Sequence, residues 1–412
     1  MKHLITLTLF ALLTINARPQ SFYNSSLDST IAVYIDKINA DSAQSYMQSL
    51  QDFGTRFCLA PNRREIATWL KNKFISFGYE DVVLDSFPYN RTWNNVYCQT
   101  WQYNVVCNYP GYLDPQKIYI LGAHYDSYVK SPSNPFLLAP GADDNASGVA
   151  AALEVARIMK QYGYAPKFTI RFMAFAAEEL GLHGAYHYAN KAAQQNMQIQ
   201  CMINNDMISY DVGGPLTWKL KIQKYPNSQW VTNLATQIAQ QHTTLEVTDS
   251  TQYIGNSDSY PFYLNGYAAI FLQENTFTPF YHTVNDLVSS TSKNYTAEMI
   301  KVSVGMLIHQ NGIGLNTGVI GIPDRQIASL HSNFPNPFKD QTTLHYTLSE
   351  DGWVSLRVYD AWYREVAVIR GGHAMAGTER IRFDRGNLLA GMYFCVLQTD
   401  KHRQAIKLII TD

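Results

Sequence analysis

Apolar residues recur along the first three quarters of the chain in two patterns, one with the period of a helix and one typical of a buried strand. The stretch 64–77 places its large apolar residues on one helical face: Ile66, Trp69, Leu70, Phe74 and Ile75. IYILGAHY (118–125) and FTIRFMAFAA (168–177) are instead continuous apolar runs. Such runs suit strands that are buried on both faces of a sheet.

These patterns alternate, which indicates the class of fold. A helix-rich region at 29–78 and a strand-like block at 81–108 come first. The strands predicted after them are 118–125, 168–177, 199–207 and 268–273, and the predicted helices are 147–162, 185–197, 230–241 and 295–308. Alternation of this kind indicates a doubly wound α/β fold, in which helices flank a mostly parallel sheet.

The pattern changes near residue 311. GIGLNTGVIGIPD (312–324) is rich in glycine and is typical of a linker. Short alternating runs with turn signals between them follow, at 342–348, 353–360, 364–370, 379–384, 391–397 and 405–410. We expect a small all-β sandwich there. The predicted organisation is a signal peptide (1–17), an α/β domain (18–315), a linker (316–329) and a β-sandwich (330–412).

The N-terminus indicates export. A short basic start, an apolar run from Leu4 to Leu13 and the small residue Ala17 are typical of a secretory signal peptide cleaved near Ala17. The run is too short to span a bilayer, so we expect no stable membrane span. A buried first strand or helix is the alternative. The net charge of −1, without an extended Lys/Arg run, gives no electrostatic footprint for nucleic acid.

The five cysteines leave two interpretations open. Export permits disulfides, and Cys98 and Cys107 lie on strand-like runs that a hairpin would bring together. Buried free thiols are the other interpretation, and the odd count leaves at least one cysteine unpaired. The absence of a CxxC motif argues against a cysteine zinc knuckle or a redox site.

Metal-ligand residue types follow the predicted strands. They are His124, Asp126, Asp144, Glu178, Glu179, Asp206 and His282. Imidazole and carboxylate are ligands that zinc accepts, and sites built from them are more often catalytic than structural. Because ligands bind beyond the carboxyl ends of strands in open α/β sheets, we expect a hydrolytic metal centre at that rim.

The spacing of these residues suggests separate roles. His124 and Asp126 are two residues apart, so an extended backbone aims both the same way, which suits a ligand and a carboxylate that orients it. Glu178 and Glu179 diverge on an extended backbone, so one can bind metal while the other acts as general base. Each residue also has an ordinary explanation. Glu178 and Glu179 could begin a solvated helix, Asp126 could cap a turn, Asp143 to Asn145 could cap a helix, and His282 could lie on the surface.

Five motifs together resemble the secreted di-zinc aminopeptidases of metallopeptidase family 28, over about residues 30–315. They are GAHYDS (122–127), PGADDNASG (140–148), AAEELG (176–181), the strand end at Asp206 and YHTVND (281–286). The resemblance implies two Zn²⁺ ions bridged by Asp144. His124 and Asp206 would complete the first site, and Glu179 and His282 the second.

The resemblance also implies a mechanism. Glu178 would be the general base for a metal-bridged water, Asp126 would orient His124, and Tyr281 would stabilise the oxyanion, with Tyr253 as a rival. Phe280, Tyr260 and Phe262 would line a specificity pocket, unless they belong to the core. The substrates would be peptides with a free N-terminus. A glutaminyl cyclase-like acyltransferase and an inactive peptidase-fold surface binding protein are the alternatives.

The C-terminal sequence carries a second resemblance. SNFPNPFKDQTTLHYTLSEDGWVSLRVYD (332–360), LLAGMYFCVL (388–397) and AIKLIITD (405–412) are similar to the type IX secretion sorting domain of Bacteroidetes. This implies that the type IX secretion machinery is a partner and that the protein is secreted or held at the cell surface. A sandwich that binds carbohydrate or stabilises the enzyme is the alternative.

Overall fold

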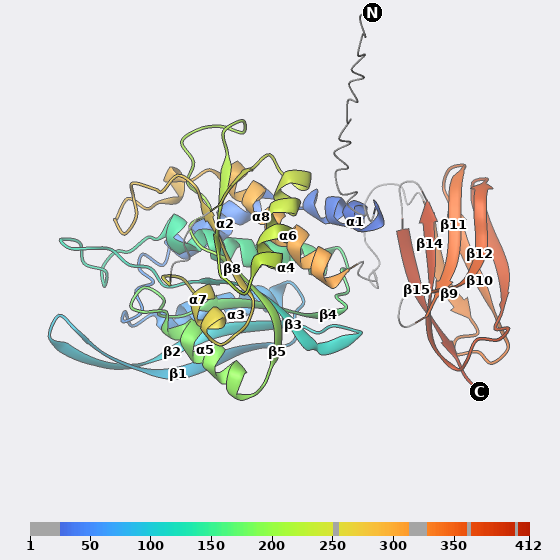
Figure 1. Ribbon diagram of the computed structural model, residues 1–412, viewed down its shortest axis with the longest axis horizontal. Helices are drawn as coiled ribbons and strands as arrows, with labels where there is room; N and C mark the ends of the chain where they lie inside the picture. The colour runs from blue at the N-terminus through green and yellow to red at the C-terminus, as the bar shows by residue number, and fades with distance from the viewer. Residues whose placement is uncertain (1–24, 250–254, 313–327, 361–363, 400–402) are drawn as a thin grey trace, which may run out of the picture.

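The computed structural model describes residues 25–249, 255–312, 328–360, 364–399 and 403–412 (Figure 1). Its first part is built on one eight-stranded mixed sheet with the order β1-β2-β4-β3-β5-β8-β6-β7. The strands are β1 (Val82–Trp93), β2 (Val96–Tyr109), β3 (Asp114–His124), β4 (Phe168–Phe175), β5 (Gln198–Asn205), β6 (Lys219–Lys224), β7 (Glu246–Asp249) and β8 (Ala269–Glu274). The expected α/β class is confirmed, and β6 and β7 are additional to the predicted strands.

The centre of the sheet is parallel. β4, β3, β5 and β8 are neighbours that run in the same direction. β2 pairs antiparallel with β4 on one side, and β6 pairs antiparallel with β8 on the other. The parallel strands are almost completely buried, as their continuous apolar runs require. Their carboxyl ends therefore share one rim.

Helices cover both faces of the sheet. They are α1 (Ser25–Ile35), α2 (Ala40–Gln51), α3 (Arg63–Ser76), α4 (Gly148–Gln161), α5 (His183–Gln194), α6 (Gln229–His242), α7 (Ser259–Leu264) and α8 (Lys293–Asn311). The main hydrophobic core includes residues of α1 to α4, α6 and α8. A second cluster joins α5 and α7 to the sheet, through residues such as Tyr188 and Phe262. This two-sided arrangement is the doubly wound one that the alternation predicts.

The hairpin of β1 and β2 differs from the expected pair of strand-like runs. Asn94 and Asn95 form its turn with positive φ angles of 47° and 64°, which asparagine tolerates better than most residues. β2 is one long strand that carries both Cys98 and Cys107, so these thiols cannot bridge the hairpin. All five cysteines are free, and the interpretation as free thiols is the one that holds.

The C-terminal part is an all-β unit with its own core. β9 (Ala328–Phe334), β10 (Gln341–Leu348) and β13 (Gly377–Asp384) form one sheet, and β11 (Gly352–Tyr359), β12 (Glu365–Ala374), β14 (Gly391–Thr399) and β15 (Arg403–Ile410) form the other. Every ladder in both sheets is antiparallel. A separate cluster that includes Leu344, Leu356 and Leu397 fills the unit. β9 begins slightly before the expected boundary at residue 330.

The expected signal peptide lies outside the described residues. Within the described ranges, no helix combines the length and the apolar character that crossing a membrane requires.

Candidate metal centre

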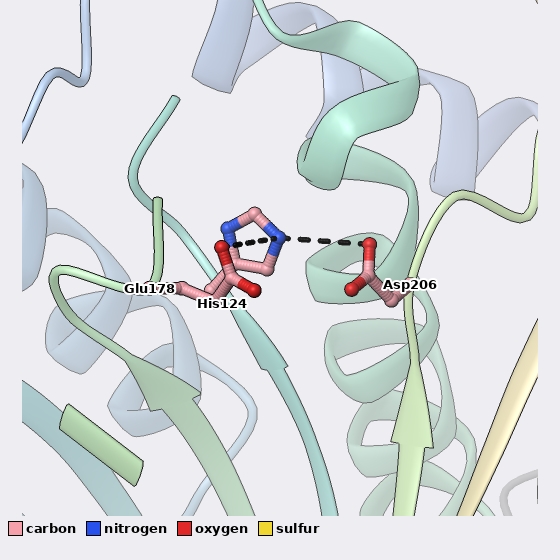
Figure 2. A group of neighbouring side chains, drawn as sticks. All are labelled: His124, Glu178 and Asp206. Atoms are coloured by element: carbon pink, nitrogen blue, oxygen red, sulfur yellow. Dashed lines mark ion pairs between the residues drawn. The ribbon is translucent and has the colours of Figure 1, made fainter. Parts of the chain in front are cut away.

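Three adjacent parallel strands deliver side chains to one rim of the sheet. His124 is the last residue of β3, Glu178 and Glu179 follow β4, and Asp206 follows β5 directly. Figure 2 shows His124 between the carboxylates of Glu178 and Asp206. The Nε2 atom of His124 lies 3.6 Å from Asp206 Oδ1 and 3.9 Å from Glu178 Oε2. The ends of these strands thus bring together His124, Glu178 and Asp206, as the sequence pattern predicts.

Asp144 occupies an irregular turn at the start of α4. Its φ and ψ angles of −106° and 90° are not helical, so the regular helix begins only after this residue. Gly141 allows the turn because it has a φ of 53° and because an added Cβ would lie 2.5 Å from the Asp144 carbonyl oxygen. Asp286 holds the turn from the other side, since its carboxylate accepts the N–H groups of Asp143 at 2.8 Å and Asp144 at 3.0 Å.

Asp144 links the two halves of the cluster. Its Oδ1 lies 3.3 Å from His124 Nε2, while its Oδ2 lies 3.2 Å from His282 Nε2. The same His282 nitrogen lies 2.7 Å from Glu179 Oε2. One carboxylate therefore faces two groups of ligand-type atoms, His124 with Asp206 and Glu179 with His282. A carboxylate that presents one oxygen to each group can bridge two ions.

The residues present fit metal ions. Nδ1 of His282 and Oε1 of Glu179 are buried without a hydrogen-bond partner among the described residues. Buried polar atoms normally have partners, and atoms left without one call for an explanation such as an ion. Imidazole nitrogens and carboxylate oxygens form the donor set that zinc takes in catalytic sites. Ligand-type atoms of His124, Glu178 and Asp206 also lie within 4.8 Å of one another, so distance alone does not separate Glu178 from the ligands.

Burial and the neighbouring charges shift the pKa values in the cluster. Burial raises the pKa of Glu178 well above its usual range, and burial together with the charge of Asp144 raises that of Glu179 to about 8. Burial alone would lower the pKa of His282, but hydrogen bonds to Asp144 and Glu179 raise it to about 9. The His124 and His282 rings keep the pKa of Asp144 below its usual range, although burial opposes them. The buried carboxylates therefore favour positive charge at this site.

Asp126 connects β3 with the two glutamates. Its carboxylate accepts the backbone N–H of Glu178 at 2.9 Å and that of Glu179 at 3.2 Å. It also lies 3.7 Å from Nδ1 of His124, whose nearer contact is the Asp126 carbonyl oxygen at 3.2 Å. The sequence suggests only the contact with the imidazole, while the structure adds the hold on the backbone of both glutamates.

Several residues around the cluster had no predicted role. Ser257 donates a hydrogen bond to Asp206 Oδ2 at 2.5 Å, and the neighbouring Asp258 is fully buried with both carboxylate oxygens unpartnered in the described residues. Arg56 is buried beneath the turn and donates to the carbonyl oxygens of Pro140 at 2.6 Å and Gly141 at 2.7 Å. Asp286, which holds the turn at Asp144, is the last residue of the YHTVND motif. It is therefore the one supporting residue that a sequence motif could have indicated.

The backbone next to the cluster is strained. Ala177 precedes Glu178, Met207 follows Asp206, and His282 is itself a ligand candidate; all three have positive φ angles of 56° to 58°. Residues other than glycine adopt this region at an energetic cost, and proteins often keep such residues at active sites. The strain thus coincides with the residues that carry ligand-type side chains.

The aromatic candidates have different positions. The Tyr281 ring stacks on His282 with 3.7 Å between centroids. Phe280 is half-buried and packs edge-on against Tyr210 at 6.2 Å. Phe262 is fully buried in the cluster of α5 and α7, with Tyr260 packed against it, which favours the core interpretation for both. Tyr253 lies outside the described residues.

Comparisons with known proteins agree with this geometry. Residues 104–306 match the family described as peptidase family M28, and residues 332–411 match the secretion system C-terminal sorting domain. A probable zinc metalloprotease of Pyrenophora teres f. teres is 36% identical over 193 residues, which are 44% of this chain and 41% of the relative. The chain thus spans about two fifths of the length of that relative. A probable leucine aminopeptidase of Arthroderma otae is 27% identical over 70% of this chain and 76% of its own.

Solved structures share the fold of the α/β part. The LapA aminopeptidase of Legionella pneumophila superposes with a TM-score of 0.58 and 21% identity, over 69% of this chain and 75% of its own. The glutaminyl cyclase of Fimbriiglobus ruber superposes with a TM-score of 0.54 and 17% identity, over 66% of this chain and 95% of its own. At these identities the likeness concerns the fold alone.

Proposed function

We propose that this chain, which carries a peptidase family M28 domain over residues 104–306, is a secreted zinc-dependent aminopeptidase that removes N-terminal residues from peptides. The observation that supports this most directly is the position of Asp144 between two histidines. Its two oxygens lie 3.3 Å from His124 Nε2 and 3.2 Å from His282 Nε2. Asp206 stands beside the first histidine and Glu179 beside the second.

These residues would hold two Zn²⁺ ions. His124, Asp144 and Asp206 would bind one, and Asp144, Glu179 and His282 the other. Bound zinc would supply an activated water and a polarised scissile carbonyl, and it would leave a position for the free amine of the substrate. The protein contributes the charge, the spacing and the exclusion of solvent, because His124, Asp144 and Asp206 are all nearly inaccessible.

Glu178 is the group proposed to move the proton. Glu178 is 9% exposed, and its Oε2 atom lies 3.9 Å from His124 Nε2. Burial raises its pKa, so the carboxyl group can hold a proton taken from water until it passes it to the leaving amine. Asp126 is proposed to fix that carboxylate by accepting the Glu178 N–H. Tyr281 is the proposed donor to the oxyanion, from its position stacked on His282.

Export is the second part of the proposal. The sorting domain over residues 332–411 supports delivery to the outside or to the cell surface by the secretion machinery that such domains serve. We place the boundary between the two domains after α8, which ends at Asn311, and before β9, which begins at Ala328. The separate core of the C-terminal unit supports a domain that is folded independently of the enzyme.

Glutaminyl cyclase activity is the second candidate, and it has a structural neighbour in its favour. Three measurements would separate the possibilities: hydrolysis of amino acid amides, hydrolysis of the same amides with a blocked N-terminus, and conversion of a glutaminyl peptide into its pyroglutamyl form with release of ammonia. We expect the free-amine amides alone to be hydrolysed. Activity should disappear with a chelator and return with about two zinc ions per chain. Formation of a pyroglutamyl peptide with loss of ammonia, or no activity after zinc is restored, would contradict the proposal.

A further inference from the structure

A pocket of about 540 Å³ lies next to the metal centre, between the tip of the β1–β2 hairpin and the loop after β3. Both segments project on the same side of the α/β part (Figure 1). The apolar side chains that line the pocket include Trp93, Val96, Tyr128, Val129 and Phe136, and the lining also holds uncharged polar residues such as Asn94 and Ser131. Its volume falls in the range of small-molecule and side-chain binding sites.

The pocket is built on a rigid aromatic base. Phe57 is fully buried, and its ring contacts Trp93 at 5.3 Å, Tyr128 at 5.9 Å and Phe136 at 5.0 Å between centroids. The hairpin and the loop therefore share one packed cluster. A hydrogen bond of 2.6 Å from Thr55 Oγ1 to the carbonyl oxygen of Pro135 fixes the loop further.

Two contacts join the pocket to the metal centre. Tyr128 lies edge-on to the ring of His282, with 5.1 Å between centroids. The backbone N–H of Lys130 donates to the carbonyl oxygen of His282 at 2.9 Å. A group bound in the pocket would thus lie beside the half of the centre that contains His282 and Glu179.

The rim of the pocket is open to solvent along two of its own apolar side chains. Val96 is 62% exposed on the hairpin, and Phe136 is 38% exposed on the loop. No peptide chain precedes the N-terminal residue of a substrate, so a closed pocket can hold that residue. The part of the substrate after the scissile bond continues as a chain, so its binding site must be open to solvent. The exposed apolar rim fits a chain that continues. No charged side chain lines the pocket within the described residues, which disfavours charged occupants.

We propose that this pocket binds the side chain of the residue that follows the scissile bond, and that it favours an apolar or aromatic side chain there. The proposal rests on the peptidase function, because it assigns one subsite of that same centre. Val96 is the best residue for a test, since it lines the pocket and is 62% exposed, so that a change there leaves the core intact. Val83 offers a matched control, because it is 47% exposed on the same hairpin and does not line the pocket.

The experiment compares tripeptides that share the preferred N-terminal residue and carry Phe, Ala, Asp or Lys in second place. Amino acid amides, which place nothing in the pocket, supply the reference rate for each protein. The wild type should prefer Phe over Lys by about tenfold or more in kcat/KM. Val96→Asp should reduce that preference by about tenfold, and Phe136→Ala should reduce the preference for Phe over Ala. Val83→Asp should match the wild type.

The possible failures are distinct. If the wild type hydrolyses no amide, the peptidase function itself is wrong. If amides are hydrolysed but the preferences of Val96→Asp and Phe136→Ala equal those of the wild type, the pocket does not bind the second residue. If the variants change the preference among amides instead, the pocket binds the N-terminal side chain and the proposal is overturned.

Discussion

The carboxylate of Asp126 accepts a hydrogen bond from the backbone amide of Glu178, with 2.9 Å between Oδ1 and N. This contact ties the end of β3 to the turn that follows β4, so the residue that carries the proposed base is fixed by a neighbour of the proposed ligand His124. The second oxygen of the same carboxylate accepts the N–H of Glu179. Asp126 is in this sense a positioning residue for both glutamates.

Asp126→Asn should lower kcat/KM by about 10- to 100-fold, because an amide group can accept only one of the two N–H bonds and turns its own donor toward the other. The zinc content should fall as well, since Glu179 loses its support. Asp114→Asn is a suitable control, because Asp114 lies at the opposite end of β3 in a partly exposed pair with Lys117. A variant with wild-type rate and zinc content would show that the two backbone contacts are dispensable.

Glu178→Gln should separate proton transfer from metal binding. The variant keeps the shape of the side chain and should bind zinc like the wild type, but kcat should fall by about 10²- to 10⁴-fold because the amide cannot take a proton. Glu179→Gln should instead lose zinc, since Oε2 of Glu179 lies 2.7 Å from His282 Nε2. Metal analysis beside steady-state kinetics distinguishes the two. Near-normal turnover in Glu178→Gln would assign the base elsewhere.

Zinc affinity should fall steeply on acidification. In the metal-free protein, hydrogen bonds to Asp144 and Glu179 raise the pKa of His282 to about 9 against the effect of burial. A protonated ring cannot bind metal, so below pH 9 each binding event must displace this proton. The affinity should therefore rise with pH up to about 9 and drop by about tenfold per unit below it for each proton displaced. Chelator competition between pH 6 and pH 9 measures this, and a flat profile would exclude proton displacement.

Arg56→Met should destabilise the fold by at least about 3 kcal/mol. The guanidinium group is buried and donates to carbonyl oxygens of Tyr125, Leu50, Pro140 and Gly141 at 2.6 to 3.1 Å, which would lose their partner. Burial lowers its pKa to about 10, so it stays charged near neutral pH. Denaturant unfolding measures the change, with exposed Arg64→Met expected within about 0.5 kcal/mol of the wild type. Equal stabilities would mean that water replaces the lost donors.

The sequence predicted the strands and the position of the metal-ligand residues best where neighbouring residues alone determine the structure. Apolar runs predicted β3, β4 and β5, and the polar residues after them were expected at one rim because parallel strands end together. β6 and β7 were missed because their sequences lack a continuous apolar run. Of the two interpretations left open for the cysteines, a bridge between Cys98 and Cys107 is excluded, because the turn at Asn94 and Asn95 makes β2 a single long strand that carries both thiols.

Residues that act through long-range contacts could not be found in the sequence. Arg56 reaches the turn at Gly141 from the segment between α2 and α3, and Ser257 reaches Asp206 from the segment before α7. Neither has a local pattern that indicates its partner. The pocket beside His282 was equally hidden, since its two walls belong to segments that meet only in the folded protein.

Asp144 also determines when the proposed metal centre can be completed during synthesis. It stands between His124, which is made early, and His282, which belongs to a loop near the end of the α/β part. In a nascent chain that does not yet include His282, Oδ2 of Asp144 lacks the histidine that it faces in the folded protein. The proposed activity therefore cannot arise before almost the whole α/β domain has been synthesised.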